Sequence, residues 1–454
     1  MTTLREDLLD VHPARQRVSL ALAIVATVPG LAIRVTQPSL PHPGEALLYG
    51  LAIVGAAFLL SWAAEVAQLD ISAGLAIAVL AFIAVLPEYA VDLVFASKAG
   101  NAVQQFGAAC GPPIVPIDER PCSLALANMT GANRLLIGIG WSMVVFIAWY
   151  RVRTLRRRRS TGRLSVHDEH ALSAQTGRGV TLERSHAVEI SYLALATIYS
   201  LTLPLKHSIT LFDAVVLIGI FVAYTVRISR APAEEPHLVG PARYLGTFSV
   251  TGRRTAVIAM FLFAAGVILL CAEPFAESLV ATGETVGISS FVLVQWLAPL
   301  ASEAPELLVA GLYAWRLNTD AGLGTLVSSK VNQWTLLVGT LPIVFALSAS
   351  RLHGLPIEPR QREELLLTAA QSLFALAILA NLSISVREAW LLFGLFWAQF
   401  IVGGLVPESL HGVERIAVSV IYLALGVGIF LRDRRRLPGL MRDGFRVDHA
   451  DLRG

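Results

Sequence analysis

Residues 292–311, VLVQWLAPLASEAPELLVAG, form an apolar stretch of bilayer-spanning length that contains Ser302, Glu303 and Glu306. An ionised carboxylate at membrane depth costs at least ~2.5–3.5 kcal/mol, so such a group usually faces a protein interior or an aqueous cavity and marks an ion or proton pathway. Pro299 and Pro305 each remove a backbone donor and leave a carbonyl one turn upstream without its helical partner. The stretch therefore predicts a membrane helix that carries part of a polar site.

A second stretch with the same core lies in the other half of the chain. Residues 76–97, AIAVLAFIAVLPEYAVDLVFAS, carry Leu86-Pro87-Glu88 where the later stretch carries Ala304-Pro305-Glu306. Each stretch is followed by a helix with a knot of polar residues, ANMTGANR at 127–134 and SSKVNQW at 328–334. This pattern predicts an internal repeat whose polar residues lie near the bilayer midplane.

The composition also indicates an integral membrane protein. The 454 residues are 55% hydrophobic and 15% charged, with a mean hydropathy of +0.63, whereas soluble globular proteins are about 25% charged. The net charge of +3 is small, and the basic residues form short clusters between apolar runs, which argues against a nucleic-acid partner. The three cysteines, Cys110, Cys122 and Cys271, show no metal-ligand spacing. A disulfide between Cys110 and Cys122 is left open.

Apolar runs of roughly spanning length give twelve candidate membrane helices, at about residues 18–35, 45–67, 71–98, 124–150, 186–203, 208–228, 254–281, 287–315, 321–349, 363–380, 387–406 and 413–431. If every run spans, four groups of Arg residues, at 151–159, 227–230, 253–254 and 432–436, fall on one side of the membrane. By the positive-inside rule that side and both termini are cytoplasmic, although Arg351, Arg360 and Arg362 come out on the far side. The two Pro-Glu helices then cross in opposite directions, so the repeat is inverted.

At these residues the chain resembles the calcium:cation antiporter superfamily, which includes the sodium/calcium exchangers. Members carry a GTSLPE-like and a GNxxGSN-like motif in each of two inverted repeats, and the resemblance covers mainly residues 45–150 and 254–349. It implies an all-α integral membrane fold of about 10–12 helices in two halves, with no cofactor beyond the transported Ca2+, Na+ or H+. The expected parts are an N-terminal tail and extra helix at 1–44, a first half at 45–230, a connecting loop at 231–253, a second half at 254–406, and an extra helix with a basic tail at 407–454.

The resemblance assigns the two cation-binding carboxylates to Glu88 and Glu306. In the first repeat, Ala84 and Val85 stand where the GTSLPE-like motif has Thr and Ser. In the second repeat Glu303 replaces Ser, and Lys330 stands at the Asn of the GSN position. These replacements remove neutral oxygens that a sodium site needs. The candidate cation-binding residues are Glu88, Glu306, Asn128, Asn133, Ser302, Glu303 and Ser329, with Asp92, Lys330 and Arg134 as charge partners.

The residues themselves suit a divalent cation. Ca2+ takes about six to eight oxygen ligands, and carboxylates together with proline-freed carbonyls can supply them. Asp92 shares a helical face with Glu88, as Ser302 and Glu303 do with Glu306. Because Glu303 and Lys330 replace neutral residues together, we expect Lys330, with Glu303 as its candidate partner, to act as a tethered cation. Proton exchange at Glu88 and Glu306 would then drive transport.

The main expectation is a secondary antiporter that exchanges Ca2+ or a related divalent cation against H+ or Na+ by alternating access. Three alternatives are a monovalent cation/proton antiporter, an intramembrane hydrolase and a non-transporting sensor or scaffold in which Lys330 blocks the site. The hydrolase is disfavoured because the sequence has no HExxH or GxSxG motif. We expect the partners to be the lipid bilayer and small inorganic cations, and the location to be the bacterial inner (cell) membrane.

Overall fold

The computed structural model describes residues 13–70, 86–160, 169, 172, 179–230, 238, 240–448 and 451–452, and this part of the chain is almost entirely helical. Its α-helices are α2 (Pro13–Thr36), α3 (His42–Ala67), α5 (Leu86–Phe106), α6 (Pro121–Leu135), α7 (Ser142–Ser160), α9 (Ala187–Ser200), α10 (Leu211–Ile228), α11 (Pro241–Gly246), α12 (Val250–Val286), α13 (Ser290–Trp315), α14 (Thr319–Asn332), α15 (Val338–Ala349), α16 (Pro359–Leu379), α17 (Val386–Leu405), α18 (His411–Asp433) and α19 (Leu437–Phe445). Two π-helical turns, η3 (Leu136–Trp141) and η6 (Gln333–Leu337), join α6 to α7 and α14 to α15. The strands are β1 (Gly179–Thr181), β2 (Ser208–Ile209), β3 (Leu355–Pro356) and β4 (Ser383–Ser385).

Ten helical segments among the described residues are long and apolar enough to cross a membrane: Pro13–Thr36, His42–Ala67, Pro121–Ser160, Arg184–Leu205, Leu211–Ile228, Val250–Val286, Ser290–Trp315, Thr319–Ala349, Val386–Leu405 and His411–Asp433. They match ten of the twelve predicted spans. The other two predicted spans correspond to α5 and α16. For the α5 span, residues 71–85, including Ala84 and Val85, lie outside the described part. The predicted all-helical architecture is confirmed.

The chain forms two compact units that alternate along the sequence. Unit 1 comprises Met1–Met129, Thr225–Pro305 and Val344–Leu352, and unit 2 comprises Thr130–Tyr224, Glu306–Ile343 and His353–Gly454. Boundaries fall inside α6, α10, α13 and α15, so each of these helices contributes residues to both units. The two predicted halves, residues 45–230 and 254–406, are each continuous in sequence. This division of the chain stays a prediction.

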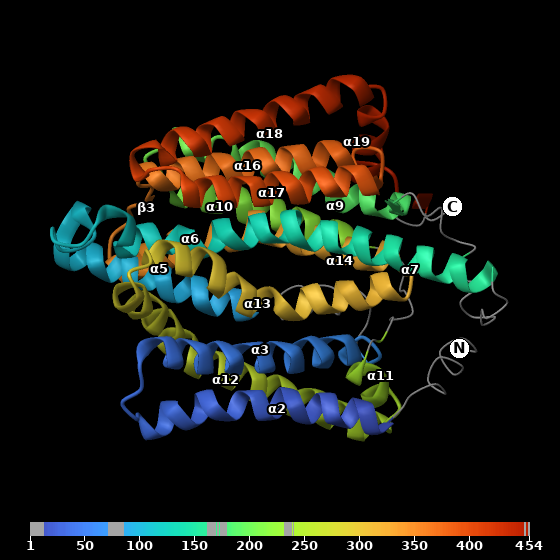
Figure 1. Cartoon of the computed structure of the whole chain (residues 1–454), viewed down its shortest axis with the longest axis horizontal. Helices are drawn as coiled ribbons and strands as arrows, with labels where there is room; N and C mark the ends of the chain where they lie inside the picture. The colour runs from blue at the N-terminus through green and yellow to red at the C-terminus, as the bar shows by residue number, and fades with distance from the viewer. Residues whose placement is uncertain are drawn as a thin grey trace. The chain divides into compact units, whose positions relative to one another are not determined.

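In unit 1, α3 packs against both α2 and α12 (Figure 1). Small residues permit this close approach, as is usual between membrane helices. A Cβ on Gly30 of α2 would lie 2.5 Å from the Cβ of Ala52 in α3. A disulfide joins Cys110, which follows α5 by four residues, to Cys122 at the start of α6, the pairing that the sequence left open.

In unit 2, α16 packs against α9 and α18, and α17 packs against α7 (Figure 1). Two short antiparallel sheets join loops on either side of α16 in the sequence. Strand β2 pairs with β3, which precedes α16, and β1 pairs with β4, which follows α16. Directly after β4, Ser385 and Glu388 form a capping box that starts α17.

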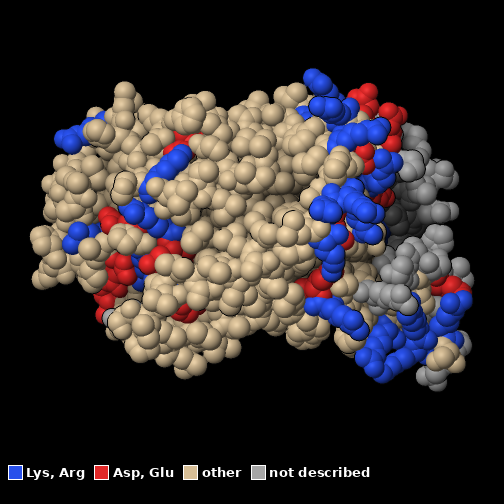
Figure 2. All heavy atoms as spheres, turned by 90° about the horizontal axis from the view of Figure 1, so that it is seen from above, with Lys and Arg blue, Asp and Glu red and all other residues tan. Residues whose placement is uncertain are grey.

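Charged side chains avoid the middle of the face shown in Figure 2. Lys and Arg gather toward one end of that face with Asp and Glu among them, a smaller charged group lies toward the other end, and a broad band between them has neither. Helix α18 follows this pattern, because its charged residues are Glu414 and Arg415 near its start and Arg432 and Asp433 at its end. An apolar band between two charged ends is what the hydrocarbon core of a bilayer requires.

The two polar knots end in the same unusual turn. Helix α6 passes into η3 at Leu136, three residues after Asn133, and α14 passes into η6 at Gln333, three residues after Lys330. Single π-helical turns are rare and occur frequently at functional sites. Their identical placement supports the alignment in which Asn133 and Lys330 occupy equivalent positions of the two repeats.

Close packing of η3 on α17 gives a test of the fold. A Cβ at Gly138 would lie 2.3 Å from the ring of Phe396, whereas a Cβ at Gly394, also on α17, would meet nothing within 4 Å. We expect Gly138→Ala to lower the melting temperature of the detergent-solubilised protein, because overpacking typically costs about 1–3 kcal/mol. Gly394→Ala is the control and should not lower it. Equal melting temperatures for Gly138→Ala and the parent would contradict this packing.

Candidate cation-binding site

In unit 1, one of the predicted carboxylates of α5 contacts the first polar knot. Glu88 and Asp92 stand one turn apart, and both are buried. Asn128 of α6 is fully buried and donates a hydrogen bond of 2.9 Å from Nδ2 to Asp92 Oδ1. The structure thus brings together two predicted residues, Asp92 and Asn128, that lie 36 positions apart in the sequence.

Two buried oxygens of this cluster lack a hydrogen-bond donor in the described part of the chain. They are Asp92 Oδ2 and Asn128 Oδ1. Buried acceptors are almost always satisfied, and leaving one unsatisfied costs about 1–3 kcal/mol. A cation that has lost its water would supply the missing positive partner for both oxygens. The pair is therefore suited to bind a cation one helical turn from Glu88.

Ser302 and Glu303 lie on the unit 1 part of α13, and both are buried. The hydroxyl of Ser302 donates to the main-chain oxygens of Ala298 and Pro299, at 3.3 and 3.4 Å. Its proton is therefore directed to the helix backbone, and its oxygen lone pairs stay available as neutral acceptors.

In unit 2, Glu306 is held by the second polar knot. Ser329 of α14 donates a hydrogen bond of 2.7 Å from its hydroxyl to Glu306 Oε2. Glu306 is half-buried and Ser329 is buried. A hydroxyl bonded to a carboxylate fixes the direction of that carboxylate. Glu306 and Ser329, both selected from the sequence, are thus in contact.

Lys330 binds the residue that occupies its equivalent position in the first repeat. Its Nζ donates to the main-chain oxygen of Asn133 at 2.7 Å and to Asn133 Oδ1 at 2.6 Å. Both residues are fully buried, and Nζ lies 5.4 Å from the centre of the Trp334 ring, within cation–π range. The ammonium therefore takes two oxygens that a metal cation could otherwise use. The predicted pairing of Lys330 with Glu303 stays a prediction.

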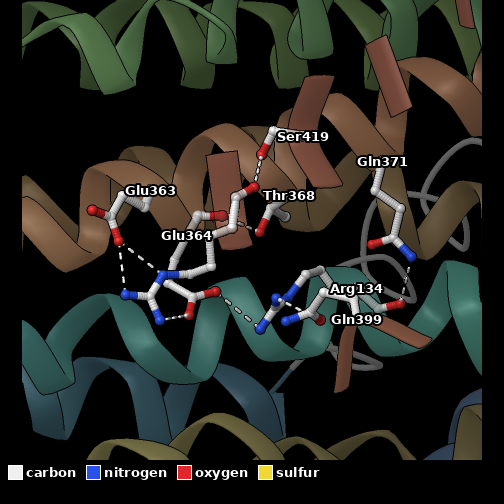
Figure 3. Close-up of polar contacts among 8 residues, drawn as sticks. Arg134, Glu363, Glu364, Thr368, Gln371, Gln399 and Ser419 are labelled. Atoms are coloured by element: carbon white, nitrogen blue, oxygen red, sulfur yellow. Dashed lines mark hydrogen bonds and ion pairs between the residues drawn. The ribbon is translucent and has the colours of Figure 1, made fainter. Parts of the chain in front are cut away.

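Arg134, the charged residue that ends the first knot, has a partner that was not among the predicted site residues. Its Nη2 lies 3.0 Å from Oε2 of Glu364 in α16, and the two side chains are 2% and 4% exposed (Figure 3). Its Nη1 also lies 3.4 Å from Oε1 of Gln399 in α17. A buried guanidinium paired in this way is a structural counter-ion and has no capacity to bind a metal cation.

Glu364 was not predicted as a site residue, although the sequence carried a signal for it. It lies at the start of the apolar run 363–380, where burying an ionised carboxylate costs free energy as it does at Glu88. Its neighbours Arg360, Arg362 and Glu363 indicated an ordinary charged loop instead. Within the described residues, no three His, Cys, Asp or Glu side chains come close enough to hold a metal ion.

Comparison with known proteins agrees with these observations. The profile of the family described as sodium/calcium exchanger protein matches residues 45–229 and 256–402. A crystal structure of the H+/Ca2+ exchanger CAX is 40% identical, with a TM-score of 0.82 over 97% of this chain and 100% of that chain. The chain belongs to the sodium/calcium exchanger family.

More distant structures share the fold. The structure of native YfkE is 14% identical, with a TM-score of 0.52 over 91% of this chain and 99% of that chain. No match was found among curated proteins. The resemblance to the calcium:cation antiporter superfamily and the all-α membrane fold are confirmed. The chain is a membrane cation antiporter, and its family is one of transporters, not of enzymes.

Asp92 offers a test of the unit 1 cluster. We expect Asp92→Asn to raise the Ca2+ concentration that gives half-maximal transport by roughly tenfold or more, because an interaction with a charged ligand is worth about 1.5–3 kcal/mol. The measurement is the Ca2+ dependence of uptake into proteoliposomes. Glu277→Gln is the control, since that carboxylate is exposed in unit 1 and paired with Lys98. An unchanged Ca2+ dependence in Asp92→Asn would remove Asp92 from the site.

Proposed function

We propose that the chain exchanges Ca2+ or a related divalent cation against H+ by alternating access, without a requirement for Na+. Glu88 and Glu306 bind the transported cation. Asn128, Ser302, Glu303 and Ser329 provide further oxygens, and Asp92 contributes charge next to Glu88. Asn133 holds the ammonium of Lys330.

The position of Lys330 is the observation that favours H+ as the coupling ion. Its ammonium donates to both oxygens of Asn133, which the family resemblance counts among the cation ligands. A sodium ion needs several neutral oxygens in one place, and a tethered ammonium competes for two of them. Protons need no such cage, because the carboxylates that bind Ca2+ can themselves be protonated. The 40% identity to a structure named as an H+/Ca2+ exchanger supports the same choice.

Ion-gradient transport tests this function. We expect Ca2+ uptake into proteoliposomes with an acidic interior in the absence of Na+, and no uptake driven by an outward Na+ gradient at equal pH. Glu88→Gln and Glu306→Gln should each reduce the rate to roughly a tenth or less, because each removes a charged ligand. Glu277→Gln should transport like the parent. Uptake that follows only the Na+ gradient would contradict H+ coupling.

One alternative is favoured by the same observation. A chain in which Lys330 fills the cation position permanently would be a non-transporting sensor or scaffold. The absence of uptake under every gradient in well-folded parent protein, with uptake restored by Lys330→Asn, would identify this alternative. Monovalent cation flux without Ca2+ flux would instead identify a monovalent cation/proton antiporter.

We further propose that both termini lie in the cytoplasm of a bacterial cell, with the protein in the inner (cell) membrane. Support comes from contacts between loops. The topology with twelve spans puts β1 and β4 on the cytoplasmic side and puts β2 and β3 outside, and these are the strands that pair. In unit 1, Arg253 donates two hydrogen bonds of 2.8 Å to Asp70, and both are expected on the cytoplasmic side. These bonds hold the pKa of the Asp70 carboxyl below its usual value.

The disulfide tests this orientation. The proposed topology places residues 107–120 outside, where an oxidising environment preserves the Cys110–Cys122 bond. In intact cells, a membrane-impermeant reductant followed by an impermeant maleimide should label Cys110 and Cys122. The double variant Cys110→Ser/Cys122→Ser should stay unlabelled, since the remaining Cys271 is buried in α12. Labelling of the parent only after the membrane is permeabilised would show that the orientation is the opposite of the proposed one.

A further inference from the structure

Helix α16 carries a polar face inside unit 2. Glu364, Gln371 and Ser372 are all buried, and positions seven and eight residues apart share one side of a helix. Most other residues between Leu365 and Leu379 are apolar. None of the three polar residues belongs to the motifs that the family resemblance used. Polar groups at such depth need partners, and their partners identify what the face does.

The first partner is the residue that follows Asn133. Glu364 pairs with the guanidinium of Arg134 at 3.0 Å, and Gln371 Nε2 lies 3.5 Å from the main-chain oxygen of Arg134 (Figure 3). The first contact fixes the side chain of Arg134, and the second fixes its backbone. Because Asn133 is the preceding residue, its two oxygens are fixed with it.

The second partner is the aromatic residue beside Lys330. Ser372 Oγ accepts a hydrogen bond of 2.8 Å from the indole Nε1 of Trp334. The same indole ring lies 5.4 Å from Lys330 Nζ. One face of α16 therefore contacts Trp334, whose ring lies near the ammonium, and Arg134, whose neighbour Asn133 accepts hydrogen bonds from the ammonium.

Glu364 is itself held from the other side. Arg415 of α18 lies 3.8 Å from Glu364 Oε1, and it pairs with Glu363 at 2.7 Å. Figure 3 shows Glu364 reaching from its helix toward the guanidinium group of Arg134. Buried ion pairs seldom stabilise a fold more than apolar residues would, but they impose one geometry on the groups they join. A positioning role accounts for the presence of charge here.

We propose that the polar face of α16 positions the Asn133–Lys330 pair, with Glu364 acting through Arg134 and Ser372 acting through Trp334. The inference rests on the proposed role of Lys330 as a tethered cation. Glu364 and Ser372 are positioning residues, because their contacts are with Arg134 and Trp334. When either contact is lost, the ammonium leaves the oxygens of Asn133 part of the time, and Na+ gains access to them.

The experiment measures H+-driven Ca2+ uptake into proteoliposomes as a function of Ca2+, with and without Na+. For Glu364→Gln and Ser372→Ala we expect about a three- to tenfold rise in KM, a maximal rate per folded protein within about twofold of the parent, and inhibition by Na+ that the parent lacks. Thr368→Val is the matched control. It removes a buried hydroxyl from α16 whose hydrogen bond goes to the helix's own Glu364 main-chain oxygen.

A loss of folding alone predicts a different result. It would lower the maximal rate in proportion to folded protein and leave KM and Na+ sensitivity unchanged, and that outcome overturns the positioning role. Ser372→Ala is the milder change and decides the question if Glu364→Gln yields little protein. Repeating both changes in a Lys330→Gln background should produce no further shift, because they act through Lys330.

The Lys330→Gln variant separates the role of Lys330 from the positioning role of α16. If Lys330→Gln itself transports with the KM and Na+ insensitivity of the parent, Lys330 is not a tethered cation, and the positioning role of α16 is wrong as well. If Lys330→Gln becomes sensitive to Na+ while Glu364→Gln and Ser372→Ala do not, only the positioning role is wrong. Equal shifts in Thr368→Val and Ser372→Ala would also overturn it.

Discussion

The buried ammonium of Lys330 is the constraint on which the arrangement of unit 2 depends. A charge at membrane depth must be neutralised or solvated by the protein. Here the solvation comes from both oxygens of Asn133 and the ring of Trp334. These groups come from two polar knots about 200 residues apart in sequence. The requirement to satisfy one amine thus fixes α6 against α14, and both helices turn into π-helical geometry three residues later.

The remaining buried charges differ in how completely they are satisfied. In unit 2, Arg134 and Glu364 pair with each other, and Glu306 accepts from Ser329. In unit 1, Asp92 Oδ2 and Asn128 Oδ1 have no donor within the described residues. Satisfied pairs fix the geometry of the groups they join, whereas unsatisfied acceptors are available to bind a cation. We accordingly assign Glu364 to positioning, and Asp92 with Asn128 to binding.

Much of the fold and part of the site could be predicted from the sequence. The apolar runs predicted the all-helical membrane architecture, because length and hydropathy decide membrane insertion locally. The Pro-Glu cores and polar knots predicted the family through their resemblance to its motifs. The contacts of Asp92 with Asn128 and of Glu306 with Ser329 join residues that were selected in advance. The partner of Arg134 was not predicted, because tertiary packing decides which of several acids a buried Arg meets. The π-helical turns carry no residue pattern of their own.

The most direct test of the account is to count protons moved per Ca2+ in Na+-free proteoliposomes with a trapped pH indicator. With H+ as the coupling ion, the acidic lumen becomes alkaline in step with Ca2+ uptake, and added Na+ changes neither flux. Ca2+ uptake that needs Na+ and moves no protons would contradict the assignment of Lys330 as the tethered cation.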